Sequence, residues 1–312
     1  MKKTAILIFL FSLTACASLT ETQVNAVHQF ANATSDFSNY PKKVTDELAI
    51  IRRESRMFDA NAQLDRSEHI RRLEKIYSEE TLDLRYTRKV ELTFNVLDKY
   101  AQSLLLLSTT NSDDLEKQAK NFGIEIDSLI VLYNTIDNVR KIPTGIGGAV
   151  SQVIATGGKK YLTARRAKDL KKFVPQGDVL VAHMTANLVS YLDKKVYVSA
   201  LNDSLGLKDL IASQRKSLEE DYGSYLSTVF FRNQAPPLDT DREYLSLLRR
   251  LDNVEKLRTQ TIAATKKLRE AHAAISKEMY AKRTLKESLK EIQALYEDVK
   301  NIRMTLAEIK NP

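Results

Sequence analysis

Two stretches of more than seventy residues contain neither glycine nor proline, and this feature most constrains the fold. The first stretch is Lys42–Phe122 and the second is Leu238–Asn311, while all nine glycines fall between Gly123 and Gly223. Glycine and proline are the usual breakers of helices. The sequence therefore predicts an all-α fold, and we expect an elongated bundle of long antiparallel helices with coiled-coil-like packing.

Apolar spacing and capping residues predict the first helices. A capping box at Thr20–Gln23 opens a short helix that Pro41 interrupts. The next helix is expected to continue to Ala60, and Asn61–Asp65 is the predicted break before a long helix that ends near Ser108.

The middle of the chain alternates helices with polar or glycine-rich connections. A heptad pattern from Leu115 to Ile136 predicts a helix that packs along its neighbours in coiled-coil fashion. A Gly-rich uncharged connection follows at residues 143–158. We then expect a basic helix to Phe173 and two further helices, at Asp178–Ala200 and Leu207–Phe231, with a loop at Asn233–Pro237.

The last segment is predicted to be helical, and the sequence leaves open whether 239–310 is one unbroken helix. Thr240–Glu243 fits a capping box, and the apolar pattern behind it runs to Leu306. Unbroken, this helix would be about 105 Å long. The weakly apolar part from Arg258 to Ala274 is where we expect a bend or a contact outside the bundle.

The N-terminus has the features of a secretory leader. Lys2 and Lys3 precede an apolar run, Ala5–Leu13, that is too short to span a bilayer. The run ends in Leu13-Thr14-Ala15-Cys16, which resembles the lipobox of bacterial lipoproteins. That resemblance covers this segment alone, and the alternative is a secreted protein with an incidental cysteine.

The lipobox resemblance implies that residues 1–15 are a signal peptide and that Cys16 is acylated, so that it anchors the chain in a membrane. Residues 16–40 are then the anchor and short first helix, and 41–312 the bundle. Ala17 is not the aspartate that retains such proteins in the inner membrane, which favours an outer-membrane lipoprotein facing the periplasm. Cys16 is the only cysteine, so an acylated chain has no thiol for a disulfide or a metal.

The positive charge is concentrated in one segment. The formal net charge is +8. The segment between Asn138 and Pro175 contains nine basic residues and one acidic residue, Asp169. Basic segments of this kind bind anionic partners. The candidate contact residues are Arg140, Lys141, Lys159, Lys160, Arg165, Arg166, Lys168, Lys171 and Lys172.

The uncharged segment Ile142–Gly158 has two interpretations. It is a flexible connection whose small residues let helices pack closely, or it touches lipid while the basic helix behind it binds anionic headgroups. In the second interpretation the architecture is similar to the α-helical pore-forming toxins of the cytolysin A type, which are long bundles with an apolar hairpin at one end. No sequence motif carries that similarity.

No pattern in the chain indicates catalysis. The four histidines, His28, His69, His183 and His272, have no second ligand at metal-binding spacing. The glycines match neither a phosphate loop nor a dinucleotide fingerprint, and no G-x-S-x-G elbow occurs. We therefore expect no enzymatic activity, no cofactor and no metal.

The function expected from the sequence is a lipid-anchored spacer, scaffold or adaptor of the bacterial cell envelope that binds a partner protein. The alternative is a membrane-active bundle that uses residues 142–172 to engage anionic lipid. An inhibitor of an envelope enzyme is a third possibility without residue-level support. Export from the cytoplasm disfavours nucleic acid as the partner of the basic segment.

Overall fold

The computed structural model describes residues 19–108, 115–135, 141–142, 144–145, 148, 162–193, 207–280 and 285–310, with the side chains of 80–89, 115–120, 122, 162–169 and 310 left out. Within these residues the chain forms eight helices and no strand, which confirms the predicted all-α class. The helices are α2 (Glu21–Phe37), α3 (Pro41–Asn61), α4 (Arg66–Ser108), α5 (Leu115–Asn134), α7 (Leu162–Asp193), α8 (Leu207–Phe231), α9 (Leu238–Glu278) and α10 (Lys286–Lys310).

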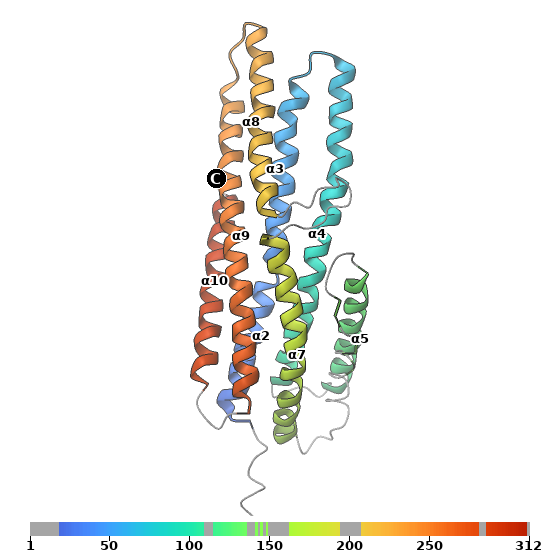
Figure 1. Ribbon diagram of the computed structural model, residues 1–312, viewed down its shortest axis with the longest axis vertical. Helices are drawn as coiled ribbons and strands as arrows, with labels where there is room; N and C mark the ends of the chain where they lie inside the picture. Colours follow the sequence, from blue (N-terminus) through green and yellow to red (C-terminus); the bar gives the residue numbers. More distant parts are fainter. Residues whose placement is uncertain are drawn as a thin grey trace, which may run out of the picture.

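Two helical connections lie together at one end of the molecule. The α3–α4 connection (62–65) and the α8–α9 connection (232–237) are both at the upper end of Figure 1, which we call the tip. The opposite end, where α2 begins and α9 ends, we call the base. Because α9 runs from the tip to the base over 41 residues, the two ends lie about 60 Å apart.

Contacts along α9 fix its direction relative to α2. The side-chain amide of Gln23 donates to the carbonyl oxygen of Glu278 over 3.1 Å, and the ring of Phe30 lies edge-on to that of His272 at 5.4 Å. Higher numbers on α2 therefore meet lower numbers on α9. The chain enters the described fold at the base, beside the last turn of α9.

Several predicted boundaries are confirmed. The Thr20 hydroxyl accepts from the backbone N–H of Gln23 at 3.2 Å, and the Gln23 side chain accepts from the Thr20 N–H at 2.9 Å, which completes the capping box. Pro41 occupies the first turn of α3. The Asp65 carboxylate accepts from the Glu68 N–H at 2.9 Å and caps α4. The bounds of α8 are those predicted.

The predicted break between Phe173 and Asp178 is wrong, because α7 continues through Pro175. A proline in a helix cannot donate to the carbonyl four residues earlier, which here belongs to Lys171. The hydroxyl of Tyr280 donates to that carbonyl oxygen over 2.7 Å. A side chain from the end of α9 thus replaces the hydrogen bond that Pro175 removes, and the helix persists.

The sequence left open whether residues 239–310 form one unbroken helix, and the structure shows two helices. α9 ends at Glu278 and the chain returns as α10, which packs along α9. The N-cap of α9 is Pro237, without a side-chain hydrogen bond, in place of the predicted box at Thr240. The segment Arg258–Ala274 does not leave the bundle, because Ala264, Leu268 and Ala271 in it are fully buried.

Candidate functional site

The structure describes the side chains of only three of the nine predicted contact residues. Cys16, Arg140, Lys159 and Lys160 are not among the described residues, and neither is most of the Gly-rich connection. Arg165, Arg166 and Lys168 are placed only as backbone positions on the first turns of α7. The side chains of Lys141, Lys171 and Lys172 are described.

The structure does not bring these three lysines together. Lys141 precedes Ile142, whose backbone exchanges two hydrogen bonds of 2.8 Å with the side chain of Asn134. Tyr133, next to Asn134, contacts Asn187 on α7. Asn187 lies sixteen residues beyond Lys171 on the same helix, so Lys141 is at a level about 24 Å away from Lys171 along α7.

The described part of the Gly-rich connection folds back on α5. The carboxylate of Asp127 accepts from the backbone N–H of Gly145 at 3.2 Å and from that of Gly148 at 3.0 Å. Gly145 has a φ of +96°, a conformation that glycine adopts without strain. These contacts hold residues 145 and 148 beside the middle of α5.

The basic beginning of α7 lies at the base. The hydrogen bond from Tyr280 to Lys171 joins α7 to the end of α9, and the hydrogen bond from Gln23 to Glu278 joins the same end of α9 to the first turn of α2. In Figure 1 the lower end of α7 accordingly lies beside the lower ends of α2 and α9. Lys171, Lys172 and the start of the described chain therefore share one end of the molecule.

The tip carries a group of exposed apolar side chains that the sequence analysis did not single out. Leu64, Phe230, Phe231 and Leu238 are 62%, 59%, 77% and 62% exposed. The hydroxyl of Thr228 on α8 donates to the carbonyl oxygen of Ala62 over 2.9 Å, which ties the two connections together. We call these four side chains the apolar tip, and they are the candidate binding surface.

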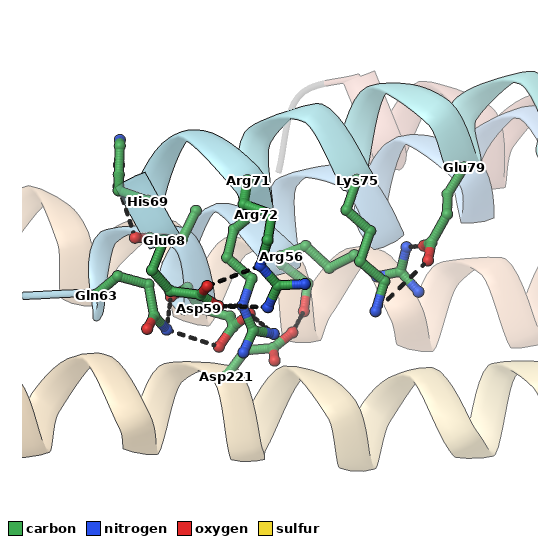
Figure 2. Close-up of polar contacts among 12 residues, drawn as sticks. Arg56, Asp59, Gln63, Glu68, His69, Arg71, Arg72, Lys75, Glu79 and Asp221 are labelled. Carbon is green, nitrogen blue, oxygen red and sulfur yellow. Dashed lines mark hydrogen bonds and ion pairs between the residues drawn. The ribbon is translucent and has the colours of Figure 1, made fainter. Parts of the chain in front are cut away.

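A network of charged groups braces the α3–α4 connection behind the apolar tip. Figure 2 shows Arg72 reaching from α4 to Asp59 on α3, a contact of 2.8 Å, while its Nε lies 2.9 Å from Glu68. Arg71 also contacts Glu68, at 2.6 Å. The ring of His69 donates to the carbonyl oxygen of Ala60 over 2.7 Å and so joins the first turn of α4 to the end of α3.

The network extends down both helices and onto α8. Arg56 on α3 pairs with Glu79 on α4, and the hydroxyl of Ser55 donates to Asp221 on α8 over 2.9 Å. Partial burial raises the pKa of Asp221, and the hydrogen bond from Ser55 offsets part of that rise. Polar contacts of this kind fix the relative positions of α3, α4 and α8.

Glu68 makes the network sensitive to acid. Hydrogen bonds from Arg71 and Arg72 lower the pKa of Glu68 from 4.5 to about 2. A lowered carboxyl pKa stabilises the fold above the ordinary value, and the stabilisation is lost as the pH falls through the folded pKa. We expect Glu68→Gln to reduce the loss of stability between pH 4.5 and about 2, measured by urea unfolding.

Solvent screening keeps the contribution of Glu68 to the free energy of unfolding small. We therefore measure the slope of the free energy of unfolding against pH and compare it with that of a control variant. Glu74→Gln, on the exposed face of the same helix, is the matched control and should leave the slope unchanged. Equal slopes for the native chain and Glu68→Gln would contradict the assigned role of Glu68.

A second polar cluster, in which Tyr100 and His272 are buried and Asp178 is half-buried, lies between α4, α7 and α9. Nδ1 of His272 donates to Asp178 over 2.7 Å, and the Ser276 hydroxyl donates to the other oxygen of Asp178 over 2.7 Å. The Tyr100 hydroxyl lies 2.6 Å from Nε2 of His272. Burial and the charge of Asp178 raise the pKa of Tyr100 well above its usual value.

This cluster acts as a structural pin, by which we mean that its hydrogen bonds join the helices. The Tyr100 side chain is fully buried and His272 is 1% exposed. The hydrogen bonds that Asp178 accepts from His272 and Ser276 outweigh the effect of its burial and lower its pKa. The carboxylate is therefore retained at neutral pH and joins α7 to α9.

The described residues contain no candidate metal-binding group and no candidate membrane-spanning helix. No group of three or more histidine, cysteine, aspartate or glutamate residues there could hold a metal ion. Among the same residues, no helix combines the length and the apolar character needed to cross a bilayer.

The structure establishes the class of the protein as all-α, built from long helices. No protein-family model matches the chain, and neither a curated protein nor a solved structure matches it.

Proposed function

We propose that this protein is a lipid-anchored, non-enzymatic spacer or adaptor of the bacterial cell envelope, held by acylated Cys16 and binding a partner protein through the apolar tip. Its shape in this proposal is an elongated bundle of long antiparallel helices with coiled-coil-like packing. The bundle separates the membrane from the partner by about 60 Å, which is the length of α9.

The observation that carries the proposal is the exposure of Leu64, Phe230, Phe231 and Leu238 at the tip. Single exposed apolar residues are ordinary on protein surfaces, but a group of large ones at one place marks an interaction site. Aromatic anchors of this kind supply much of the binding energy in protein interfaces. The two phenylalanines are the expected anchors.

The brace behind the apolar tip supports the same interpretation. Asp59, Glu68 and Arg72 hold the α3–α4 connection, and the hydrogen bond from Thr228 to Ala62 holds the end of α8 against it. A surface that is fixed before binding loses less conformational entropy when the partner docks.

The test is photo-crosslinking in cells from a reactive residue at Phe231, with Ala263 as the matched control. Ala263 is exposed on the middle of α9 and far from the tip. We expect Phe231 to capture one envelope protein that Ala263 does not capture. The identified protein should bind the purified chain, and Leu64→Ser with Phe231→Ser should weaken that binding by more than about 30-fold.

Three outcomes would contradict the proposal. Equal capture from both positions would remove the apolar tip as the specific surface. A Cys16→Ser chain that stays in the membrane fraction after a high-salt wash, which removes electrostatic contacts, would contradict the anchor. Release of dye from anionic vesicles by the purified chain would replace the spacer with the membrane-active alternative.

A further inference from the structure

We infer that the base of the bundle is a second membrane contact, in which Lys171, Lys172 and Lys286 bind the anionic headgroups of the same leaflet that holds acylated Cys16. The contact would set the bundle upright, with the apolar tip pointing away from the membrane. The inference rests on the anchor of the proposed function and goes beyond it, because it assigns the basic residues a ligand and the bundle an orientation.

The length of the tether requires that the base lies close to the membrane. Only three residues separate Cys16 from Thr20, the N-cap of α2. The four Cα–Cα steps from Cys16 to Thr20 span at most about 14 Å when the chain is fully extended. The polar headgroup region is itself several Å thick on each side of the bilayer. An acylated Cys16 therefore places the first turn of α2 within reach of the headgroups.

The contacts at the base bring the lysines of two helices, α7 and α10, beside that first turn. Tyr280 binds the backbone of Lys171 on α7, and Gln23 binds that of Glu278 on α9. The hydroxyl and the backbone N–H of Ser288 both donate to the carboxylate of Glu278, the latter over 3.2 Å, so the beginning of α10 lies there too. Lys286 is on the first turn of α10.

These lysines are available to an anionic surface. Lys172 and Lys286 are exposed and Lys171 is half-buried. Among the described residues, no carboxylate forms an ion pair with any of the three. Of the acids at the base, Glu278 is engaged by Ser288, and Glu287 lies 4.0 Å from Lys277. The charge of the three lysines is left for an outside partner.

Two further features of the base fit a headgroup layer. The Tyr280 side chain is 65% exposed although its hydroxyl is bonded to Lys171, and tyrosine is enriched at membrane–water interfaces. The basic residues Arg165, Arg166 and Lys168 precede Lys171 on α7, nearer its beginning at Leu162. These sequence positions lie between Lys171 and the beginning of α7, which is the end of the helix at the base.

The test uses the chain from Ala17 to Pro312, which keeps every described helix and has no acyl chain. Flotation measures its binding to vesicles of phosphatidylcholine with phosphatidylglycerol. Each lysine near an anionic surface strengthens binding about fivefold. We expect Lys171→Gln, Lys172→Gln and Lys286→Gln together to weaken binding on the order of 100-fold, and added salt to weaken binding by the native chain.

The matched control removes the same charge from the tip region through Arg66→Gln, Arg232→Gln and Arg242→Gln, all at exposed positions. This variant should bind like the native chain. Equal weakening by both triple variants would overturn the inference, because binding would then follow net charge. Absence of binding to anionic vesicles, or equal binding to pure phosphatidylcholine, would also overturn it. Capture of a partner at Phe231 is measured separately, so the two proposals fail independently.

Discussion

Replacing Gly177 by alanine lowers the free energy of unfolding by about 3 kcal/mol, the upper range for overpacking a core. A β-carbon at this position would lie 2.0 Å from the hydroxyl oxygen of Tyr100 and 2.3 Å from its Cζ. Tyr100 cannot move aside freely, because it is fully buried, packs on Phe173 and is bonded to His272. Urea unfolding followed by circular dichroism measures the loss.

Gly223 on α8 provides a control, because alanine there is expected to raise the free energy of unfolding instead of lowering it. It is also within a helix, but nothing lies within 4 Å of a β-carbon built there. Alanine is favoured over glycine in a helix interior by about 1 kcal/mol, so Gly223→Ala should stabilise the chain by that amount. If Gly177→Ala also stabilised the fold, the close approach of Tyr100 to α7 would be wrong.

The double variant separates the clash from other effects. Tyr100→Ala removes the phenol ring and leaves room for a β-carbon at position 177. The loss in Gly177→Ala/Tyr100→Ala should then be smaller than the sum of the two single losses, because residues in contact are not additive. If the loss in the double variant equals the sum of the two single losses, the side chains at positions 177 and 100 are not in contact.

The sequence predicted helix boundaries where a local signal marks them. The capping box at Thr20, Pro41 and the polar break at Asn61–Asp65 each act through backbone hydrogen bonds of neighbouring residues, and all three are confirmed. The bounds of α8 follow in the same way from the loop at Asn233–Pro237. Local chemistry suffices for these elements.

The misplaced boundaries depend on residues far away in the chain. Pro175 signals a break, but the hydroxyl of Tyr280, more than a hundred positions later, satisfies the carbonyl that the proline leaves free. The turn between α9 and α10 contains no glycine or proline. Only the packing of α10 along α9 reveals that the chain reverses there.

The binding surfaces were predictable only in part. The charge of Lys171 and Lys172 is visible in the sequence, but their position at the base follows from the register of α7 against α9. Leu64, Phe230 and Phe231 are apolar residues near helix ends. The spacing of apolar residues in a sequence does not show which of them a neighbouring element covers. Their exposure emerges from the tertiary structure alone.

Replacing His272 by leucine should cost about 3 kcal/mol, because leucine leaves the buried Tyr100 hydroxyl without a partner and removes one of the two donors to Asp178. His28→Leu is the matched control, since His28 bonds only to Asn32 in an exposed pair, and its effect should stay within about 0.5 kcal/mol. Similar losses in both variants would contradict the structural pin.

The pH dependence of His272→Leu gives an independent reading of the same cluster. The pKa of Asp178 is lowered below 3.8 in the folded chain, so its hydrogen bonds stabilise the fold above that pH, and the stabilisation is lost as the pH falls through the folded pKa. Without His272 the pKa of Asp178 moves upward, since desolvation then meets only the hydrogen bond from Ser276. The native chain should therefore lose more stability below pH 3.8 than His272→Leu does. A steeper acid loss in the variant would mean that His272 does not stabilise the carboxylate, and that packing alone joins α7 to α9.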